Sequence, residues 1–316
     1  MQALYWNGRE LTFDFSYRAP RADERTALVK VHLAGLCSTD LQIFKGYMGF
    51  RGIPGHEFVG AVNEGPADLV GKRVVGEINF ACGQCEFCAR DLSRHCPNRS
   101  VMGILNADGA FAEYVSVPIA NLHVIPNSIS DEEAVFTEPL AAAFEILAQI
   151  QLNPGDDVLI VGDGNIGNLC AQVLRLSGAK MTALGKHPEK LALLKKSGVR
   201  TVLLDNWKAR AFDVVVEATG SASGLELALS AVRPRGALVF KSTIAGTHRL
   251  SLTSVVINEI TIIGSRCGPF TPALEALQEK TVYVTPLIEK LYTLKDGLHA
   301  VAHAGKGGAR KILLRP

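Results

Sequence analysis

Residues 156–167 read DDVLIVGDGNIG and decide the fold of the second half of the chain. The apolar run that ends at Val161 is typical of a buried strand, and the glycines after it predict a tight turn into a helix. Gly162 permits the turn, Gly164 lets the backbone approach a pyrophosphate, and Gly167 allows the helix to pack close to the sheet. Amide groups at the helix start would then face the phosphates of a dinucleotide. The alternative is a strand-to-helix turn that binds nothing.

The chain after this turn alternates between strand and helix patterns. Short apolar runs predict strands over 157–161, 181–184, 201–204, 213–218 and 237–241, with 259–264 as a candidate last strand. Helices are predicted from the glycine turn to Ser177, over 188–197 and over 224–232. Alternation of this kind implies a parallel sheet covered by helices on both faces.

The end of the second predicted strand decides which dinucleotide fits. An acidic residue about twenty positions after the glycine turn normally accepts the ribose 2′-hydroxyl of NAD and repels a 2′-phosphate. This chain has Gly185 there, followed by Lys186 and His187, which could contact a phosphate. NADP is therefore favoured over NAD. The alternative is a solvated turn whose basic residues touch nothing, with Glu189 as a poor substitute acid.

The first half of the chain has a different pattern. Up to residue 125 it is rich in short β-branched runs separated by glycine and proline, such as 27–33, 59–63, 73–78 and 113–117. At 316 residues the chain also exceeds what one hydrophobic core usually organises. We therefore predict a β-rich domain over residues 1–140, to which 265–316 returns, and a dinucleotide-binding domain over residues 141–264.

Four cysteines lie within fifteen residues, at Cys82, Cys85, Cys88 and Cys96. Thiols separated by two residues suit tetrahedral coordination of Zn²⁺, because a tight turn lets both sulfurs reach one ion. Four thiolates leave no position for a substrate, so we interpret the cluster as a structural zinc site in a loop-rich lobe. The alternative is an iron–sulfur cluster, although ferredoxin runs end with a gap of three residues, against seven here.

Composition describes an ordinary globular protein. Hydrophobic residues make up 47% of the chain, charged residues 20%, and the formal net charge is +2. This balance gives no reason to expect nucleic acid as a partner. We see neither a secretory signal nor an uncharged stretch of membrane-spanning length, so we expect a cytoplasmic protein without a membrane partner. In a reducing compartment the seven cysteines would be metal ligands and free thiols.

Several short motifs occur in an order that indicates a known family. They are Cys37-Ser-Thr39-Asp40, Gly55-His56-Glu57, the four-cysteine cluster, Thr137-Glu138-Pro139 and the glycine turn. Over nearly its whole length the chain resembles the zinc-dependent medium-chain alcohol dehydrogenases. It is most similar to the polyol, threonine and glucose dehydrogenase branch, because Glu138-Pro139 stands where other alcohol dehydrogenases place a cysteine. The resemblance implies an α/β protein with a GroES-like catalytic domain and a Rossmann doubly wound sheet, assembled as a homodimer or homotetramer.

The same resemblance implies a second zinc ion, which is catalytic. Alcohol oxidation needs an acidified hydroxyl, and zinc provides this as a Lewis acid when three protein ligands leave a position for the substrate. Cys37 and His56 are the expected ligands, with Glu138 as the third. Glu57 is either a ligand that exchanges with water or a carboxylate behind the ligands. Taken singly, Cys37 could be a buried thiol and His56 a core histidine, but their joint order favours the catalytic interpretation.

Two more side chains match the family and one departs from it. Thr39 matches the hydroxyl that accepts the alcohol proton, and Asp40 matches the residue that orients the zinc histidine. Gln42 stands where much of the family has a histidine that passes the proton towards solvent. An amide does not titrate near neutral pH, so the proton must leave through water, the cofactor ribose or another group.

The resemblance and the motifs together predict an oxidoreductase. We expect hydride transfer between a secondary alcohol or polyol, as small-molecule substrate, and NAD(P). The residues expected to contact the cofactor are Gly162, Gly164, Asn165, Ile166, Gly167, Gly185, Lys186, His187 and Thr219. The alternative is a non-catalytic NADPH-binding protein on the same fold.

Overall fold

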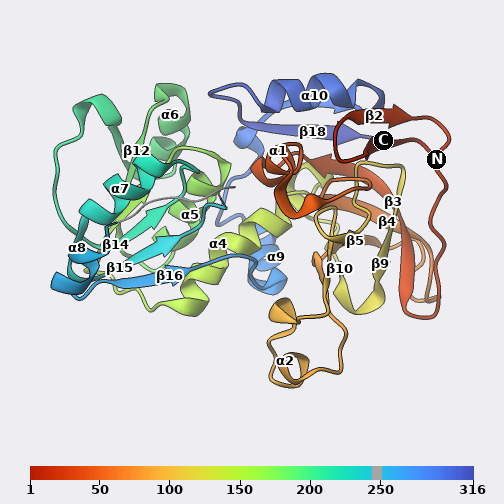
Figure 1. Cartoon of the computed structure of the whole chain (residues 1–316), viewed down its shortest axis with the longest axis horizontal. Coiled ribbons are helices and arrows are strands. Elements are labelled where there is room, and N and C mark those ends of the chain that lie inside the picture. The colour runs from red at the N-terminus through yellow and green to blue at the C-terminus, as the bar shows by residue number, and fades with distance from the viewer. Residues whose placement is uncertain (244–250) are drawn as a thin grey trace. The chain divides into compact units, whose positions relative to one another are not determined.

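The computed structural model describes residues 1–243 and 251–316. Within them the chain forms two compact units, many of whose helices and strands are labelled in Figure 1. The first unit comprises Met1–Glu138, Leu274–Glu279 and Ile288–Pro316, and the second comprises Pro139–Ala273 and Lys280–Leu287. Within the described ranges, no helix combines the length and the hydrophobicity that a membrane crossing requires.

A six-stranded sheet forms the centre of the second unit. In spatial order its strands are β13 (Arg200–Leu203), β12 (Lys180–Gly185), β11 (Asp157–Val161), β14 (Phe212–Glu217), β15 (Val232–Phe240) and β16 (Thr261–Gly264). All neighbours pair in parallel. Such strands are buried on both faces, which explains their near-continuous Val, Ile and Leu runs. The strand order reverses at β11, because the chain continues to β12 on one side and later to β14 on the other.

Helices cover this parallel sheet. They are α4 (Thr137–Gln149), α5 (Asn165–Arg175), α6 (Pro188–Lys196), α7 (Ala222–Ser230) and α8 (Thr253–Ile257). α5 packs on β11 and β12, α6 on β12 and β13, and α7 on β14 and β15. Leu159, Phe212 and Leu238 are among the buried residues of the core between them. The α/β class and the parallel sheet predicted from the sequence are confirmed.

The first unit is built on a seven-stranded sheet, ordered β10-β5-β4-β3-β18-β17, with β9 also paired to β3. Its strands are β3 (Thr26–Gly35), β4 (Glu57–Glu64), β5 (Arg73–Gly76), β9 (Tyr114–Pro118), β10 (Leu122–Val124), β17 (Ile288–Thr293) and β18 (Lys311–Arg315). The C-terminal strand β18 pairs antiparallel with β3, so that Leu313 lies opposite Gly35. The last strand of the chain therefore joins a sheet whose other central strands come from the first 76 residues.

Smaller elements complete the first unit. Strands β1 (Ala3–Trp6) and β2 (Leu11–Asp14) form a hairpin. The helices are α1 (Ser38–Ile43), α2 (Glu86–Ala89), α3 (Asp131–Ala134) and α10 (Gly297–Ala304), and α9 (Phe270–Gln278) crosses the boundary of the two units. Strands β6 (Asn79–Phe80), β7 (Ser100–Met102) and β8 (Asn106–Ala107) form a small sheet at the base of the lobe that carries α2. Figure 1 shows this lobe extending from the main sheet of the first unit.

The residues after β16 are shared between the two units, whereas the prediction placed them all in one domain. The sequence prediction assigned all of 265–316 to the first domain, whereas 265–273 and 280–287 cluster with the second unit. For 280–287 part of the reason is a pair of hydrogen bonds with a side chain of α5: the Tyr283 N–H donates to Gln172 Oε1 at 2.7 Å, and the Tyr283 carbonyl oxygen accepts from Gln172 Nε2 at 3.0 Å. The functional domain boundaries stay a prediction.

Candidate active site

Cys37 begins a short helix that holds three of the predicted site residues. α1 starts directly after Cys37, whose extended backbone makes it the N-cap. The Asp40 carboxylate accepts a hydrogen bond from the Cys37 N–H at 2.8 Å, which satisfies a donor that the first helical turn leaves unpaired. The Thr39 hydroxyl lies 3.7 Å from Cys37 Sγ. One turn of helix therefore brings a thiol, a hydroxyl and a carboxylate together.

Asp40 also faces His56. Its Oδ1 lies 3.3 Å from His56 Nδ1, and both side chains are buried. Burial is the largest single influence and disfavours the charged imidazolium, but the charges and hydrogen bonds of Asp40 and Cys37 together outweigh it and raise the pKa of His56 well above its ordinary value. A metal ligand offers a neutral nitrogen, so a bound cation would have to displace this proton. Neither Asp40 Oδ1 nor His56 Nδ1 has a well-aligned hydrogen-bond partner within the described residues, so the two side chains meet as a close ion pair, at the place from which a carboxylate can orient a ligand histidine.

Cys37, His56 and Glu57 offer ligand atoms that all lie within 4.8 Å of one another. Glu57 is the first residue of β4 and is 1% exposed. Its buried Oε1 has no hydrogen-bond partner in the described part of the chain, a state that costs free energy unless a cation or water satisfies it. Thiolate, imidazole and carboxylate are all donors that zinc accepts. This group of side chains therefore fits a zinc ion.

Lys311 is a site residue that the sequence reasoning missed. It begins β18, is 2% exposed, and pairs through Nζ with Glu57 Oε2, while also donating to the Leu36 carbonyl oxygen at 3.2 Å. Burial is the largest single influence and would lower its pKa, but the negative charges of Glu57, Cys37 and Asp40 with the hydrogen bond to Glu57 together outweigh burial and raise it. Because 254 residues separate the pair, no local motif could have revealed it. Lys311 balances one charge of the buried site.

Glu138 stands apart from this group. It is the second residue of α4, half-buried, and its carboxylate does not belong to the set of ligand atoms within 4.8 Å of one another. Of the two carboxylates, that of Glu57 and not that of Glu138 belongs to this group of ligand atoms. The choice of third ligand stays a prediction.

The four cysteines of the lobe form a tight sulfur cluster around α2. Cys85 Sγ lies 3.5 Å from Cys88 Sγ and 3.7 Å from Cys96 Sγ, and Cys96 Sγ lies 3.5 Å from Cys82 Sγ. All four sulfurs lie within 4.8 Å of one another. Sulfurs bound tetrahedrally to one zinc, with a Zn–S length of about 2.3 Å, are about 3.8 Å apart. The cluster therefore has the size that a closed zinc site needs.

The thiols of this cluster differ in acidity. A hydrogen bond from the Gln84 backbone, with one from Cys96, lowers the pKa of Cys82 to about 6. Burial and a hydrogen bond with Cys85 raise the pKa of Cys88 to about 11. Neighbouring thiols cannot all ionise easily, because each thiolate repels the next. A bound Zn²⁺ would remove that conflict by coordinating all four as thiolates.

The predicted cofactor residues lie at the reversal point of the parallel sheet, where open α/β sheets bind ligands. Gly162 adopts φ +122°, and a Cβ there would lie 2.6 Å from the Ala218 carbonyl oxygen. A Cβ at Gly167 would lie 2.1 Å from the Gly162 carbonyl oxygen, so the approach of α5 to the turn needs glycine. Gly164 caps α5, and nothing lies within 4 Å of its Cβ position. Asn165 and Ile166 form the first turn of α5.

The neighbouring strand ends supply the other predicted cofactor residues. Gly185 ends β12, Lys186 is exposed beyond it, and His187 precedes α6. Thr219 follows β14, where its N–H and hydroxyl both donate to Glu217 Oε1 at 2.6 Å. A second residue that the sequence reasoning missed is Asp163, which accepts the backbone N–H groups of Lys186 and His187. The signal was its position between two glycines of the turn.

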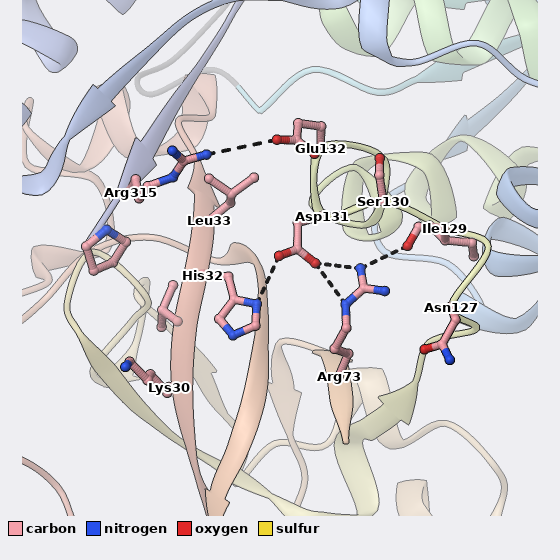
Figure 2. Close-up of a pocket in the computed structure, with 12 residues that line it drawn as sticks. Lys30, His32, Leu33, Arg73, Asn127, Ile129, Ser130, Asp131, Glu132 and Arg315 are labelled. Carbon is pink, nitrogen blue, oxygen red and sulfur yellow. Dashed lines mark hydrogen bonds and ion pairs between the residues drawn. The ribbon is translucent and has the colours of Figure 1, made fainter. Parts of the chain in front are cut away.

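A separate cavity of about 540 Å³ opens on the first unit (Figure 2), lined by residues of β3, β5, the loop into α3, and β18. Asp131 lies at its centre between His32 Nδ1, at 2.9 Å, and the Arg73 guanidinium, at 2.5 and 3.0 Å. Arg73 also donates to the Ile129 carbonyl oxygen at 2.8 Å. Asp131 is thus committed to tying β3 and β5 to α3, and none of the predicted site residues lines this cavity.

The fold and these clusters define a two-unit zinc dehydrogenase. The family model described as "Alcohol dehydrogenase GroES-like domain" matches residues 23–127, and that described as "Zinc-binding dehydrogenase" matches residues 165–280. The chain belongs to the zinc-dependent medium-chain alcohol dehydrogenase family, in its polyol-like branch. It is therefore a zinc-dependent oxidoreductase of alcohols that uses a nicotinamide cofactor and a small-molecule substrate.

Known proteins similar over the whole chain agree with this family. D-arabinitol dehydrogenase 1 of Uromyces fabae is 30% identical over 100% of this chain and 97% of that protein. Sorbitol dehydrogenase of Halalkalibacterium halodurans is 29% identical over 94% and 93%. A solved structure described as a zinc-binding dehydrogenase from Sinorhizobium meliloti 1021, bound to NADP, has a TM-score of 0.91 at 25% identity, covering 100% of this chain and 99% of the other.

Proposed function

We propose that this chain transfers a hydride between a secondary alcohol or polyol and NADP at a zinc ion held by Cys37, His56 and a carboxylate. The observation that carries the proposal is the group formed by Cys37, His56 and Glu57, whose ligand atoms lie within 4.8 Å of one another. When bound, zinc acidifies the alcohol hydroxyl and the nicotinamide ring accepts the hydride. The second unit serves as the dinucleotide-binding domain and the first as the catalytic domain.

The residues of the chain have separate tasks in this reaction. Thr39, beside Cys37, accepts the proton of the alcohol hydroxyl. Asp40 holds His56 in the tautomer that offers a free nitrogen to the metal. Lys311 balances the charge of Glu57. Because Gln42 does not titrate, the proton leaves Thr39 through water or the cofactor ribose.

The third zinc ligand is tested by metal analysis. Glu57→Gln and Glu138→Gln change one carboxylate each without changing side-chain size. We expect the variant that removes a ligand to lose zinc affinity, by about 10- to 100-fold at least, whereas the other keeps it. If both variants bind zinc like the wild type, a carboxylate ligand is rejected.

A second zinc ion per chain is proposed for Cys82, Cys85, Cys88 and Cys96. The sulfur distances of 3.5 to 3.7 Å support it. Elemental analysis of the purified protein should find two zinc ions per chain and no iron. A brown protein with visible absorption would instead support the iron–sulfur alternative.

The proposed substrate class is that of polyols and secondary alcohols. The names of the relatives, D-arabinitol dehydrogenase 1 and sorbitol dehydrogenase, support it. A panel of polyols, sugars and simple alcohols, followed at the absorbance of the reduced nicotinamide, tests the proposal. If the protein binds NADPH but turns over no member of the panel, a non-catalytic NADPH-binding role becomes the better interpretation.

NADP is the proposed cofactor, with Lys186 and His187 at the 2′-phosphate. Gly185 carries no carboxylate that would repel this phosphate. The test compares kcat/KM for NADP and NAD, and a clear preference for NAD would reject the proposal. The variant Lys186→Ala should lower kcat/KM for NADP about tenfold and leave that for NAD unchanged.

We also propose a homodimer or homotetramer in the cytoplasm. β16 is an edge strand of the parallel sheet, and apolar side chains are exposed on it, at Ile262, and on the preceding helix α8, at Val256 and Ile257. Among the described residues no cysteine forms a disulfide, which suits a reducing compartment. Light scattering on the purified protein would test the assembly, and a monomer would reject it.

A further inference from the structure

Asp163 lies in the glycine-rich turn, and its side chain points to the end of the neighbouring strand β12. Its Oδ2 accepts hydrogen bonds from the backbone N–H groups of Lys186, at 2.6 Å, and His187, at 2.7 Å. Its Oδ1 lies 3.0 Å from His187 Nδ1, and the side chain is 9% exposed. Successive backbone N–H groups beside an imidazole form an anion-binding site. The carboxylate of Asp163 fills that site from within the chain.

The same carboxylate occupies the space over Gly185. A Cβ atom at Gly185 would lie 2.3 Å from Asp163 Oδ2 and 2.5 Å from Asp163 Cβ. A side chain at position 185 would therefore collide with Asp163. In dinucleotide-binding folds the residue at the end of this strand carries the acid that accepts the ribose 2′-hydroxyl. In this chain a carboxylate therefore lies at the end of β12, but it belongs to Asp163 of the glycine-rich turn and not to the residue that ends the strand.

We propose that Asp163 is the acidic residue of the adenosine ribose subsite and that it limits the preference for NADP. The proposal rests on the proposed function, because it requires the second unit to bind a nicotinamide dinucleotide. A ribose 2′-hydroxyl can donate to the carboxylate of Asp163. A 2′-phosphate would compete with that carboxylate for the N–H groups of Lys186 and His187 and would face its negative charge.

Two opposing contributions therefore meet at the 2′ position of the ribose. The exposed ammonium of Lys186 attracts a phosphate, whereas Asp163 repels it and holds the nearest donors. We expect the wild-type protein to use both cofactors. The specificity ratio, which is kcat/KM for NADP divided by kcat/KM for NAD, should be smaller than in a site with the same two basic residues and no carboxylate. Removing Asp163 should release two backbone donors and one imidazole nitrogen to a phosphate.

The test measures that ratio in Asp163→Ala and Asp163→Asn. Dissociation constants for NADPH and NADH, from the fluorescence of the reduced nicotinamide, give a second readout that does not depend on turnover. In Asp163→Ala the ratio should rise about tenfold, because both the charge and the competition for donors are removed. In Asp163→Asn it should rise less, about threefold, because the side-chain oxygen still accepts the two N–H groups.

A matched control and a compensating variant separate specificity from structure. Glu189→Gln removes one negative charge from the exposed first turn of α6 and should change the ratio less than about twofold. The double variant D163A/G185D moves the acid to the strand end and should return the ratio to the wild-type value or below it. Because Asp163→Asn is nearly isosteric, it carries the test if the alanine variant does not fold.

Three outcomes would overturn the proposal. One is a ratio unchanged in both Asp163 variants while the two dissociation constants rise together, which would make Asp163 only a structural tie between the turn and β12. Another is a fall in the ratio, and the third is an equal rise in Glu189→Gln. The wild-type ratio tests the proposed NADP preference separately, since a wild type that prefers NAD can still shift towards NADP in Asp163→Ala.

Discussion

The two cysteine-containing clusters of the first unit differ in how the chain assembles them. The lobe cluster takes four equal donors from a single stretch of fifteen residues, so its geometry depends on local turns. The cluster of Cys37, His56 and Glu57 takes three different donors from the start of α1, the loop before β4 and β4 itself. The first arrangement offers four sulfurs that would enclose a bound ion, whereas the second has the Thr39 hydroxyl beside its thiol. The comparison suggests that the lobe stabilises the fold and the scattered group performs chemistry.

The strongest test of this division is the replacement of Cys37. In Cys37→Ala we expect turnover to fall at least about 1000-fold, because a bound zinc contributes several kcal/mol to the transition state. Metal analysis should show the loss of one zinc per chain with the melting temperature nearly unchanged. Cys170→Ala, which alters a cysteine buried on α5, is the control and should keep both zinc ions. An inactive Cys37→Ala protein that keeps both zinc ions would contradict the ligand assignment.

Replacing a cysteine of the lobe should impair stability rather than chemistry. We expect Cys88→Ala to lose the other zinc and to lower the melting temperature by roughly 10 °C or more, because metal binding contributes to folding. Calorimetry and metal analysis measure both. Glu86→Gln breaks the exposed 3.3 Å pair with Arg90 in the same lobe and should change neither quantity. A stable, correctly assembled and catalytically dead Cys88→Ala protein would remove the distinction between the two clusters.

Lys311 offers a test of how the scattered cluster is held together. Lys311→Met leaves the buried Glu57 carboxylate without its cation and should cost about 3–5 kcal/mol of unfolding free energy. Chemical denaturation measures this cost. The double variant K311M/E57Q removes both charges and should recover most of the lost unfolding free energy. Lys311→Arg keeps the positive charge, and its stability should lie between those of the wild type and Lys311→Met. Additive losses in the double variant would show that the two side chains do not interact.

Thr39 gives the smallest of the expected effects. Thr39→Val keeps the shape of the side chain but removes the hydroxyl beside Cys37, and it should lower kcat about 100-fold without loss of zinc. Thr39→Ser is the matched control, because it keeps the hydroxyl, and it should retain most of the activity. If Thr39→Val is as active as the wild type, another group accepts the alcohol proton.

Local signals allowed much of this molecule to be predicted from the sequence. Alternating strands and helices around residues 156–167 gave the parallel sheet, and short spacings identified the four-cysteine cluster. β15 was harder, because it runs from Val232 to Phe240, whereas only 237–241 was predicted. Arg233, Pro234 and Gly236 are unusual inside a strand, and a register shift opposite Phe212 and Val214 accommodates them.

The residues that the sequence did not reveal depend on contacts between distant segments. Lys311 meets Glu57 only because β18 pairs with β3. Asp163 meets Lys186 and His187 only because β12 lies beside β11 in the sheet. In the local sequence, both are ordinary charged residues. Lys311 gains a role because it is buried against the opposite charge of Glu57, and Asp163 because it is buried against two backbone N–H groups. No periodicity or motif carries that information for Lys311, whereas the position of Asp163 between two glycines of the turn is a signal in the sequence.

The pairing of Glu57 with Lys311 has a consequence for synthesis on the ribosome. Domains begin to fold while the chain is still being made, and Glu57 leaves the ribosome 254 residues before its cation. Until β18 is added to the edge of β3, the carboxylate lacks its buried partner and the sheet of the first unit has an open edge. The buried ion pair of the first unit can therefore form only after the whole second unit has been synthesised.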